Sequence, residues 1–138
     1  VLGQLRNLNK ILDFRKKAGQ SFSKVIQKYN FVKTQEVKKN NTHSFWTFAL
    51  IFKTAKTYNL FKSFFNKNGG DYFYGCWLAP YKEEFYLKLK KRKQTCRIAE
   101  KLQKKTIQLK TNYYNNVELK KQIKALEITL EHISRKKL

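Results

Sequence analysis

Acidic residues are scarce in this sequence. Its 138 residues include 9 Asp and Glu against 31 Lys and Arg, which gives a net charge of +22. Residues 1–79 hold 14 basic and 3 acidic residues and residues 80–138 hold 17 and 6, so each part carries +11. Self-repulsion on this scale disfavours a compact state unless an anionic partner neutralises it. The imbalance therefore predicts a polyanion partner for the whole chain, not for a detachable tail.

Arginine is also scarce, since only five of the basic residues are Arg. Lys, Asn, Ile, Tyr and Phe are abundant, and all five have A/T-rich codons, which indicates a drift in base composition. The same drift should raise Glu as well, yet acidic residues stay rare. Drift therefore explains why the basic residues are lysines, but it does not explain their excess over carboxylates.

Cysteine and histidine are too few and too scattered for a reactive site. Cys76 and Cys96 lie 20 residues apart without neighbouring ligands at zinc-site spacing, and His43 and His132 are far from clustered carboxylates. Asp71 follows a Gly-Gly pair, where turn chemistry is the ordinary role of an aspartate. No nucleotide-binding glycine loop or nucleophile elbow is present. We expect no catalytic residues, no metal, no cofactor and no small-molecule substrate, and hence no enzyme.

Long hydrophobic runs are missing. The longest nearly apolar run, residues 45–52, is far short of the roughly 20 residues that a membrane-spanning helix needs. Glycine and proline are rare too, with five and one respectively, and the strongest turn signal is the Asn-Gly-Gly-Asp of residues 68–71. We therefore expect a chain that does not span a membrane and that contains few sharp breaks.

Apolar spacing predicts a small helical core in residues 1–79. Residues 1–17 have the three- and four-residue apolar spacing of an amphipathic helix that ends near Gly19, and Ser21 is placed to cap a short second helix. Residues 44–66 are apolar around most of a helical circumference, which predicts a buried third helix at the centre of the core. The aromatic residues 72–79 predict a short strand or an irregular hinge. Aromatic residues beside basic ones can stack on unpaired bases, but without a recognised RNA-binding consensus we expect this segment to pack the next helix against the core.

The remainder, residues 80–138, predicts a long basic helix. Pro80 suits the first turn of a helix, Glu83 and Glu84 favour its positive end, and no Gly or Pro follows. A kink or break is expected at residues 111–116, whose helix propensity is poor. The expected fold is mostly α: a core of about three helices over 1–79, followed by a basic helical extension over 80–138.

The basic residues of this helix are the candidate RNA-binding site. A charge run is ordinarily a solvated face, but Lys93, Arg97, Lys101 and Lys105 follow i, i+4 spacing and would line one edge of the helix. Such an edge repels itself in water and is satisfied by phosphates. The expected RNA contacts are Lys88, Lys90, Lys91, Arg92, Lys93, Arg97, Lys101, Lys104 and Lys105.

A heptad-like seam ends the chain. Its apolar residues alternate by four and three over about two repeats, which is too short for an isolated coiled coil. It can pack on the same chain's core or on one partner helix, and we assign it as a candidate protein-docking surface. Its members are Leu119, Ile123, Leu126, Leu130 and Ile133.

Dispersed charge and the absence of a reactive site favour a structural RNA-binding protein of a large ribonucleoprotein. Its expected partners are ribosomal RNA and neighbouring ribosomal proteins. The codon drift, and a first residue, Val1, that suits a processed start, favour an organellar ribosome in the mitochondrial matrix. Residues 1–17 also resemble a mitochondrial transit peptide, but in a mature chain they belong to the fold. The alternative is an accessory subunit of a mitochondrial inner-membrane respiratory or ATP synthase complex, with the aromatic segment docked on membrane subunits. The third hypothesis is a DNA-binding or DNA-compacting protein.

Overall fold

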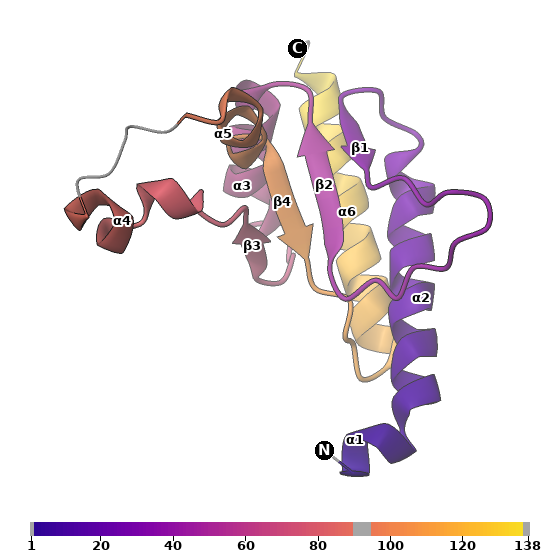
Figure 1. Ribbon diagram of the computed structural model, residues 1–138. Helices are drawn as coiled ribbons and strands as arrows, with labels where there is room; N and C mark the ends of the chain where they lie inside the picture. The colour runs from indigo at the N-terminus through magenta and orange to yellow at the C-terminus, as the bar shows by residue number, and fades with distance from the viewer. Residues whose placement is uncertain (1, 90–94, 137–138) are drawn as a thin grey trace.

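The structure, a computed structural model, describes residues 2–89 and 95–136. In this part of the chain, four strands form one antiparallel sheet, and helices lie along one of its faces (Figure 1). The elements in chain order are α1 (Leu2–Arg6), α2 (Leu8–Ile26), β1 (Val32–Thr34), β2 (Phe48–Phe52), α3 (Ala55–Phe65), β3 (Phe73–Gly75), the 3-10 turn η1 (Pro80–Lys82), α4 (Glu84–Lys88), α5 (Arg97–Gln103), β4 (Thr106–Leu109) and α6 (Asn116–Arg135).

The sheet has the strand order β1-β2-β4-β3, so β4 lies between two strands that precede it in the chain. Leu50 of β2 lies opposite Ile107 of β4, and both side chains are fully buried. The two central strands, β2 and β4, alternate a buried residue with a half-buried one, as expected of a sheet that is covered on one face only. The expected fold class, a mostly α protein, is therefore wrong.

The helical layer consists of α2, α3 and α6, which pack against the buried face of the sheet (Figure 1). Its contacts are aromatic: the ring centroids of Phe22 in α2 and Phe48 in β2 lie 5.4 Å apart, and those of Phe61 and Phe52 lie 5.1 Å apart. Leu126 of α6 is fully buried in the same core. Burial of these large rings supplies much of the hydrophobic stabilisation.

The single helix expected over residues 44–66 is wrong, although this segment does form the centre of the core. Residues 48–52 pair as a strand because alternate side chains, Phe48, Leu50 and Phe52, all reach the buried face. A helix begins only at Ala55. Thr54 caps it, since its hydroxyl accepts a hydrogen bond from the backbone N–H of Thr57. The Thr57 hydroxyl in turn accepts a hydrogen bond from the backbone N–H of Thr54, which completes a capping box.

The stop expected at Gly19 is also wrong, because α2 runs through it from Leu8 to Ile26. Gly19 is buried beneath Phe45, and the helix continues past it as one element with the segment that Ser21 was expected to cap. The turn expected at residues 68–71 is confirmed, with Gly69 at a φ of 85°. The aromatic residues that follow it contain the short strand β3.

The long basic helix expected over residues 80–138 is wrong. Thr106–Leu109 forms the strand β4, whose Ile107 and Leu109 are buried while Thr106 and Gln108 are half-buried. Pairing with both β2 and β3 stabilises this short segment as a strand. The break expected at residues 111–116 is confirmed, because the chain there forms the loop that leads into α6. The Asn115 side chain caps α6 by accepting a hydrogen bond from the Glu118 N–H.

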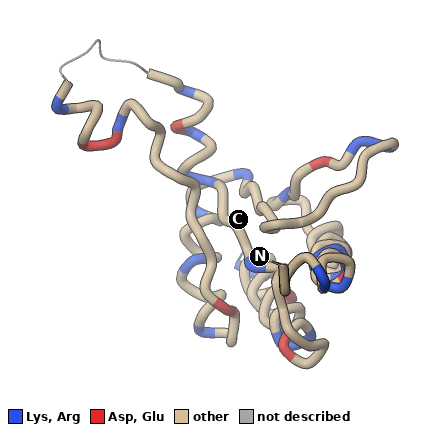
Figure 2. The backbone as a smooth tube through the Cα atoms, turned by 60° about the horizontal axis from the view of Figure 1, so that its bottom comes forward, with Lys and Arg blue, Asp and Glu red and all other residues tan. Residues whose placement is uncertain are grey.

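The boundary expected near residue 79 does not separate two structural units, because β4 and α6 complete the same sheet and core as the first 79 residues. The connection from β3 to β4 carries η1, α4 and α5, and α4 projects from the body (Figures 1 and 2). Tyr81 joins its two sides: its hydroxyl donates to Glu100 at 2.9 Å and accepts from the Cys96 N–H at 3.0 Å. Lys82 also pairs with Glu100 at 3.2 Å.

Candidate nucleic-acid interface

One face of the sheet is not covered by α2, α3 and α6, and we call it the open face. Its side chains are the alternate residues of the four strands, and in β2 and β4 they are half-buried. The strand register places them in two cross-strand rows. One row contains Lys33, Ile51 and Thr106, and the other contains Ala49, Gln108 and Tyr74.

Four exposed aromatic residues gather at one end of the open face. Trp46 is 70% exposed, Tyr72 69%, Tyr74 50% and Trp77 81%. They border a hollow of about 560 Å³, which we call the sheet-face hollow. Its remaining lining is polar or charged and consists of Arg15, Thr47, Asp71, Gln108, Lys110 and Asn112.

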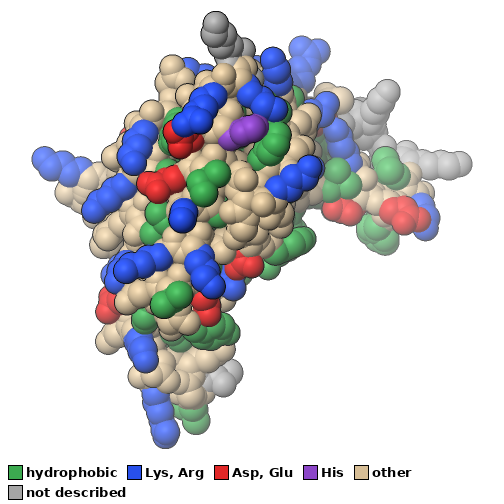
Figure 3. Space-filling model, turned by 180° about the vertical axis from the view of Figure 1, so that it is seen from behind, with side chains coloured by type: hydrophobic (Ala, Val, Ile, Leu, Met, Phe, Trp, Pro, Cys, Tyr) green, Lys and Arg blue, Asp and Glu red, His purple; other side chains and the backbone are tan. Residues whose placement is uncertain are grey.

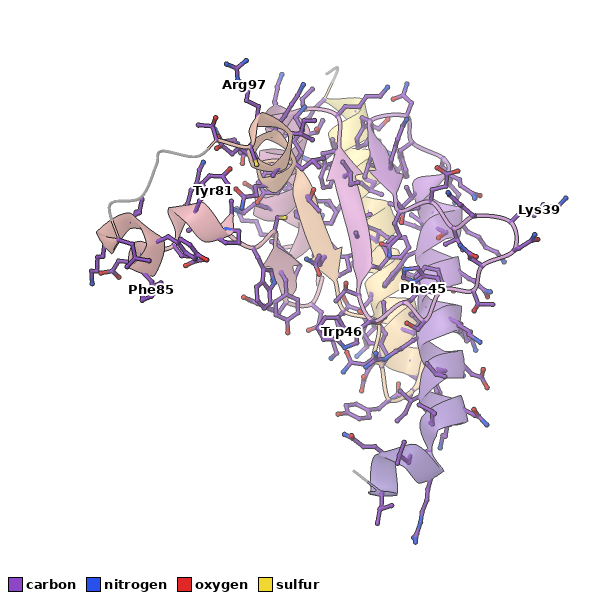
Figure 4. All side chains as sticks on the ribbon, in the orientation of Figure 1. Lys39, Phe45, Trp46, Tyr81, Phe85 and Arg97 are labelled. Atoms are coloured by element: carbon purple, nitrogen blue, oxygen red, sulfur yellow. The ribbon has the colours of Figure 1, made fainter. Side chains whose placement is uncertain are left out.

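Trp46 is exposed because the backbone turns sharply before it. Phe45 has a positive φ of 49° and packs its ring against Gly19, while the next side chain lies at the end of the strands (Figure 4). Thr111, which is fully buried, holds this turn: its hydroxyl contacts the carbonyl oxygens of Phe45 and Trp46, the latter at 3.1 Å. The backbone at Trp46 is therefore held by the loop that follows β4.

Tyr72 and Tyr74 point to the open face because they are two residues apart in an extended segment. Phe73, between them, packs on the other side against Phe61 and Phe65. The rings of Tyr72 and Tyr74 meet edge to face with centroids 5.1 Å apart. The alternation of Tyr72-Phe73-Tyr74 thus divides this run into one core residue and two residues of the hollow.

The charged side chains of the hollow come from three segments: α2, the turn before β3 and the loop after β4. The Lys110 ammonium lies 3.3 Å from a carboxylate oxygen of Asp71, whose backbone N–H donates to Gln122 of α6 at 2.7 Å. Arg15 reaches the hollow from α2 and forms no salt bridge within the described residues. Its Nε is shielded from solvent and finds no hydrogen-bond partner there. One positive charge of the hollow is therefore left without a carboxylate partner.

The predicted RNA-binding residues do not form a continuous edge. Arg97 and Lys101 are exposed on α5, but α5 ends at Gln103, so Lys104 and Lys105 follow the helix rather than extend it. Lys105 donates to the Lys53 carbonyl oxygen. Of the others, Lys88 pairs with Glu84 on α4 at 2.7 Å, while Lys90, Lys91, Arg92 and Lys93 lie outside the described residues.

α5 does not line the sheet-face hollow, but one hydrogen bond connects it to a residue that does. The side-chain amide of Gln103 donates to the backbone carbonyl of Trp77, whose ring lines the hollow. Trp77 is thus the residue of the hollow that α5 contacts. Sequence reasoning missed Trp46, Trp77 and Arg15 as site residues. The one signal available for them was the proximity of aromatic and basic residues, which on its own favoured a packing role.

The predicted docking seam packs inside the chain. Leu119, Leu126, Leu130 and Ile133 are buried against α2, α3 and the sheet, and Ile123 is partly buried against the same core. The protein-docking assignment is corrected accordingly, since these side chains cannot also contact another protein. Of the two alternatives that the seam left open, packing on the same chain's core is the one that the structure shows.

Several exposed apolar side chains lie around the connection from β3 to β4, and others lie on α1 and α6. Leu78, Phe85, Leu87 and Ile98 are each at least 49% exposed. Cys76 and Cys96 line a groove beside them and are both exposed free thiols. In the described part of the chain, no three His, Cys, Asp or Glu side chains cluster as metal ligands, and no helix has the length and hydropathy of a membrane span.

Basic residues also cover the helical side of the molecule, where lysines and arginines are spread across the surface among few carboxylates (Figure 3). Figure 2 shows the same distribution along the backbone. The described residues contain five ion pairs, between them using five of the nine carboxylates. Since 31 basic residues face those nine, most of the positive charge has no carboxylate partner.

Comparison with known proteins shows a shared fold without a shared family. No family model matches the sequence, and no curated protein sequence matches it. Two solved structures have a TM-score of 0.78: the aminotransferase TlmJ from Streptoalloteichus hindustanus, at 13% identity, and the aminotransferase PseC of Helicobacter pylori, involved in pseudoaminic acid biosynthesis, at 14% identity.

The aligned region covers 95% of this chain but only 35% and 36% of those two, so the chain spans about a third of their length. At this identity the likeness shows the fold alone. The neighbours are enzymes, so they lend no support to the expectation that this chain is not one. The structural comparison therefore shows that this chain has a fold similar to that of about one third of an aminotransferase chain.

Proposed function

We propose that this protein is a structural RNA-binding protein of a large ribonucleoprotein, and that this particle is an organellar, mitochondrial ribosome. The observation that carries the proposal is the net charge of +22. With 31 basic residues and nine carboxylates, most of the basic side chains have no carboxylate partner. Folding such a chain brings like charges together at a cost in free energy, and a standing polyanion offsets that cost. Ribosomal RNA is the partner that supplies phosphate on every side.

The proposed mechanism is phosphate neutralisation with release of counterions, which positions the protein on RNA without reading much sequence. Cations are available on each exposed element: Lys38 and Lys39 in the loop between β1 and β2, Arg97 and Lys101 on α5, and the lysines of α6. Figure 4 shows Lys39 reaching away from the body of the protein. Such a distribution suits a protein held between RNA segments more than one with a single binding groove.

The proposed role is binding and not catalysis. The aminotransferase activity in the names of TlmJ and PseC belongs to those proteins, and this chain spans a third of them. What supports a binding role is the charge and the aromatic, polar open face described above. Neighbouring ribosomal proteins are the second class of proposed partner, and the exposed apolar side chains between β3 and β4 are available to them.

The test is a gentle purification of the native protein, followed by nuclease treatment and sizing. We expect it to run in a particle of ribosomal size that contains ribosomal RNA and that nuclease disperses. If it instead stays in a detergent-solubilised assembly that is indifferent to nuclease, the proposal is overturned in favour of an inner-membrane complex. Copurification with DNA that ribonuclease does not release would overturn it in favour of a DNA-binding protein.

A further inference from the structure

We propose that the sheet-face hollow takes an unpaired RNA nucleotide, with its base stacked on the aromatic residues and its phosphate near Arg15. This inference rests on the proposed RNA-binding function and deepens it by naming a local site and a class of ligand, single-stranded RNA. The charge alone predicts binding to phosphates of any kind. The hollow adds chemistry that recognises a base.

The exposure of its aromatic residues is the first argument. Trp46 and Trp77 are 70% and 81% exposed, in a chain that buries Phe22, Phe48 and Phe61 almost completely. Large aromatic side chains that converge on one concave patch mark a binding site more often than a solvated surface. Tryptophan and tyrosine stack on unpaired bases, and this is the usual recognition of single-stranded RNA by an open sheet face.

The size of the hollow is the second argument. About 560 Å³ lies within the roughly 300–1,000 Å³ of sites for small organic groups, so a base with its ribose is a suitable occupant. Gln108 of β4 contributes to the lining, and the aromatic residues come from the loop before β2 and from the segment around β3. A duplex would present its bases already stacked and paired, and therefore could not place one here.

The polar lining is the third argument. Gln108 accepts a hydrogen bond from the Thr47 hydroxyl at 3.0 Å through its amide oxygen, which leaves the amide N–H group available. Asn112 forms no side-chain hydrogen bond to other residues that the structure describes. Side-chain amides of this kind pair with the edges of bases. Arg15, without a carboxylate partner, supplies a cation for the adjoining phosphate.

The two tryptophans of this chain both line the hollow, so intrinsic tryptophan fluorescence reports on this site. Trp77 also lines the groove beside Cys76 and Cys96, so Trp77→Ala, which leaves Trp46 as the one tryptophan, confirms that the signal comes from the hollow. The experiment titrates the full chain with a short single-stranded oligouridylate, and in parallel with inorganic polyphosphate of matched charge and with duplex RNA. We expect the oligouridylate to quench the fluorescence at saturation. Polyphosphate and the duplex, which bind through charge, should compete for the protein without producing that quenching.

Two tyrosines provide a matched pair of variants. Tyr74 lines the hollow and Tyr86 lies on α4, and each is 50% exposed. Tyr74→Ala should weaken oligouridylate binding by roughly 5- to 150-fold, the range for loss of one base stack, while Tyr86→Ala leaves it unchanged. If Tyr74→Ala does not fold, Trp77→Ala replaces it, because that side chain is 81% exposed and Trp46 remains as the fluorescent reporter.

The outcomes separate this inference from the proposed function. If RNA binds with strong salt dependence but polyphosphate quenches as well as oligouridylate does, or Tyr74→Ala and Tyr86→Ala behave alike, the hollow is not a base site and the inference is overturned while RNA binding stands. If no RNA binds in any arm, both are overturned. Quenching by oligouridylate alone, lost in Tyr74→Ala, establishes the site.

Discussion

Gly19 and Phe45 are in contact across the fold, and the contact leaves no room for a side chain at Gly19. A Cβ atom placed on Gly19 would lie 2.4 Å from Cγ of the Phe45 ring. Phe45 itself is held with a positive φ of 49°. This contact fixes the loop that leads into β2 against the middle of α2, and through that loop it fixes the neighbouring Trp46.

Gly19→Ala should destabilise the protein, although Gly to Ala in a helix interior is usually stabilising by up to ~1 kcal/mol. The added methyl group would collide with the base of the Phe45 ring, which cannot swing away without moving the strained backbone. We expect a loss of about 1–3 kcal/mol in the free energy of unfolding, as for other overpacked sites. Urea denaturation followed by circular dichroism measures it.

Gly3→Ala is the control for this variant. Gly3 lies in α1, and a Cβ placed on it would meet nothing within 4 Å. It should be neutral or slightly stabilising, in agreement with helix propensity. If Gly19→Ala matches Gly3→Ala, the contact with Phe45 does not hold the loop in place.

Leu126→Ala should cost about 2–5 kcal/mol of stability, because Leu126 is fully buried between α6 and the rest of the core. Val117→Ala, at a position of the same helix that is 63% exposed, should change stability by no more than about 0.5 kcal/mol. Urea denaturation of both variants distinguishes a core role for the seam from a docking role. A docking seam would leave the stability of the isolated chain intact in both cases.

The parts of the fold that the sequence predicted are those whose signal is local. The seam from Leu119 to Ile133 repeats at helical spacing over 15 residues, and it forms one buried helix face. The aromatic content of residues 44–66 correctly placed the centre of the core, because apolar residues of that density must be buried. Their secondary structure was misjudged, since five alternating residues also fit a helix that is apolar on several sides.

β4 could not be found in this way. Thr106–Leu109 is four residues long, little more than one helical turn, and it lies amid lysines that continue the basic pattern on either side. It is a strand because β2 and β3, more than 30 residues away in the sequence, offer hydrogen bonds on both of its sides. Non-local pairing of this kind overrides local propensity.

The sheet-face hollow was hidden for the same reason. Its residues come from α2, from the loop before β2, from around β3 and from β4, so they converge only once the strand register is known. Trp46 and Trp77 stand 31 positions apart, and nothing near them marks a shared site. For Tyr72 and Tyr74 there was a local signal as well, since an alternating strand over Tyr72-Phe73-Tyr74 places these two side chains on one face.

Tyr113 should make stability fall at alkaline pH. Burial raises the pKa of Tyr113 above its usual value near 10, and the carboxylates of Asp71 and Glu118 raise it further. Because the folded-state pKa is the higher one, the stabilisation is complete below about pH 10 and is lost as the pH rises from there toward the folded-state value. The loss can reach ~1.4 kcal/mol per pH unit.

Tyr113→Phe tests this, since phenylalanine cannot ionise. The difference in free energy of unfolding between the variant and the wild type, measured in urea from about pH 8 to 11, should grow in favour of the variant above pH 10. Taking the difference removes the titration of lysines common to both proteins. Tyr114→Phe, at a ring that is 84% exposed, is the control. Parallel pH profiles for Tyr113→Phe and the wild type would contradict the assignment.

The last prediction concerns the cations of α5. Arg97 and Lys101 are one helical turn apart, and α5 joins the sheet-face hollow through the bond from Gln103 to Trp77. If they contact phosphates of a single strand, replacing both with Gln should lower the slope of log affinity against log salt by about 1.4, since each contact contributes ~0.7. Fluorescence titration at a series of salt concentrations gives the slope.

Lys120→Gln with Lys124→Gln is the matched control, because this pair has the same spacing and the same total charge and lies exposed on α6, in the helical layer behind the sheet. Both double variants lose two charges, so the general attraction to a polyanion falls equally. A larger loss of slope for the α5 pair therefore measures local contact with the strand bound at the open face. Equal losses would mean that RNA is held by the overall charge alone, and an unchanged slope for the α5 pair would remove Arg97 and Lys101 from the RNA-binding site.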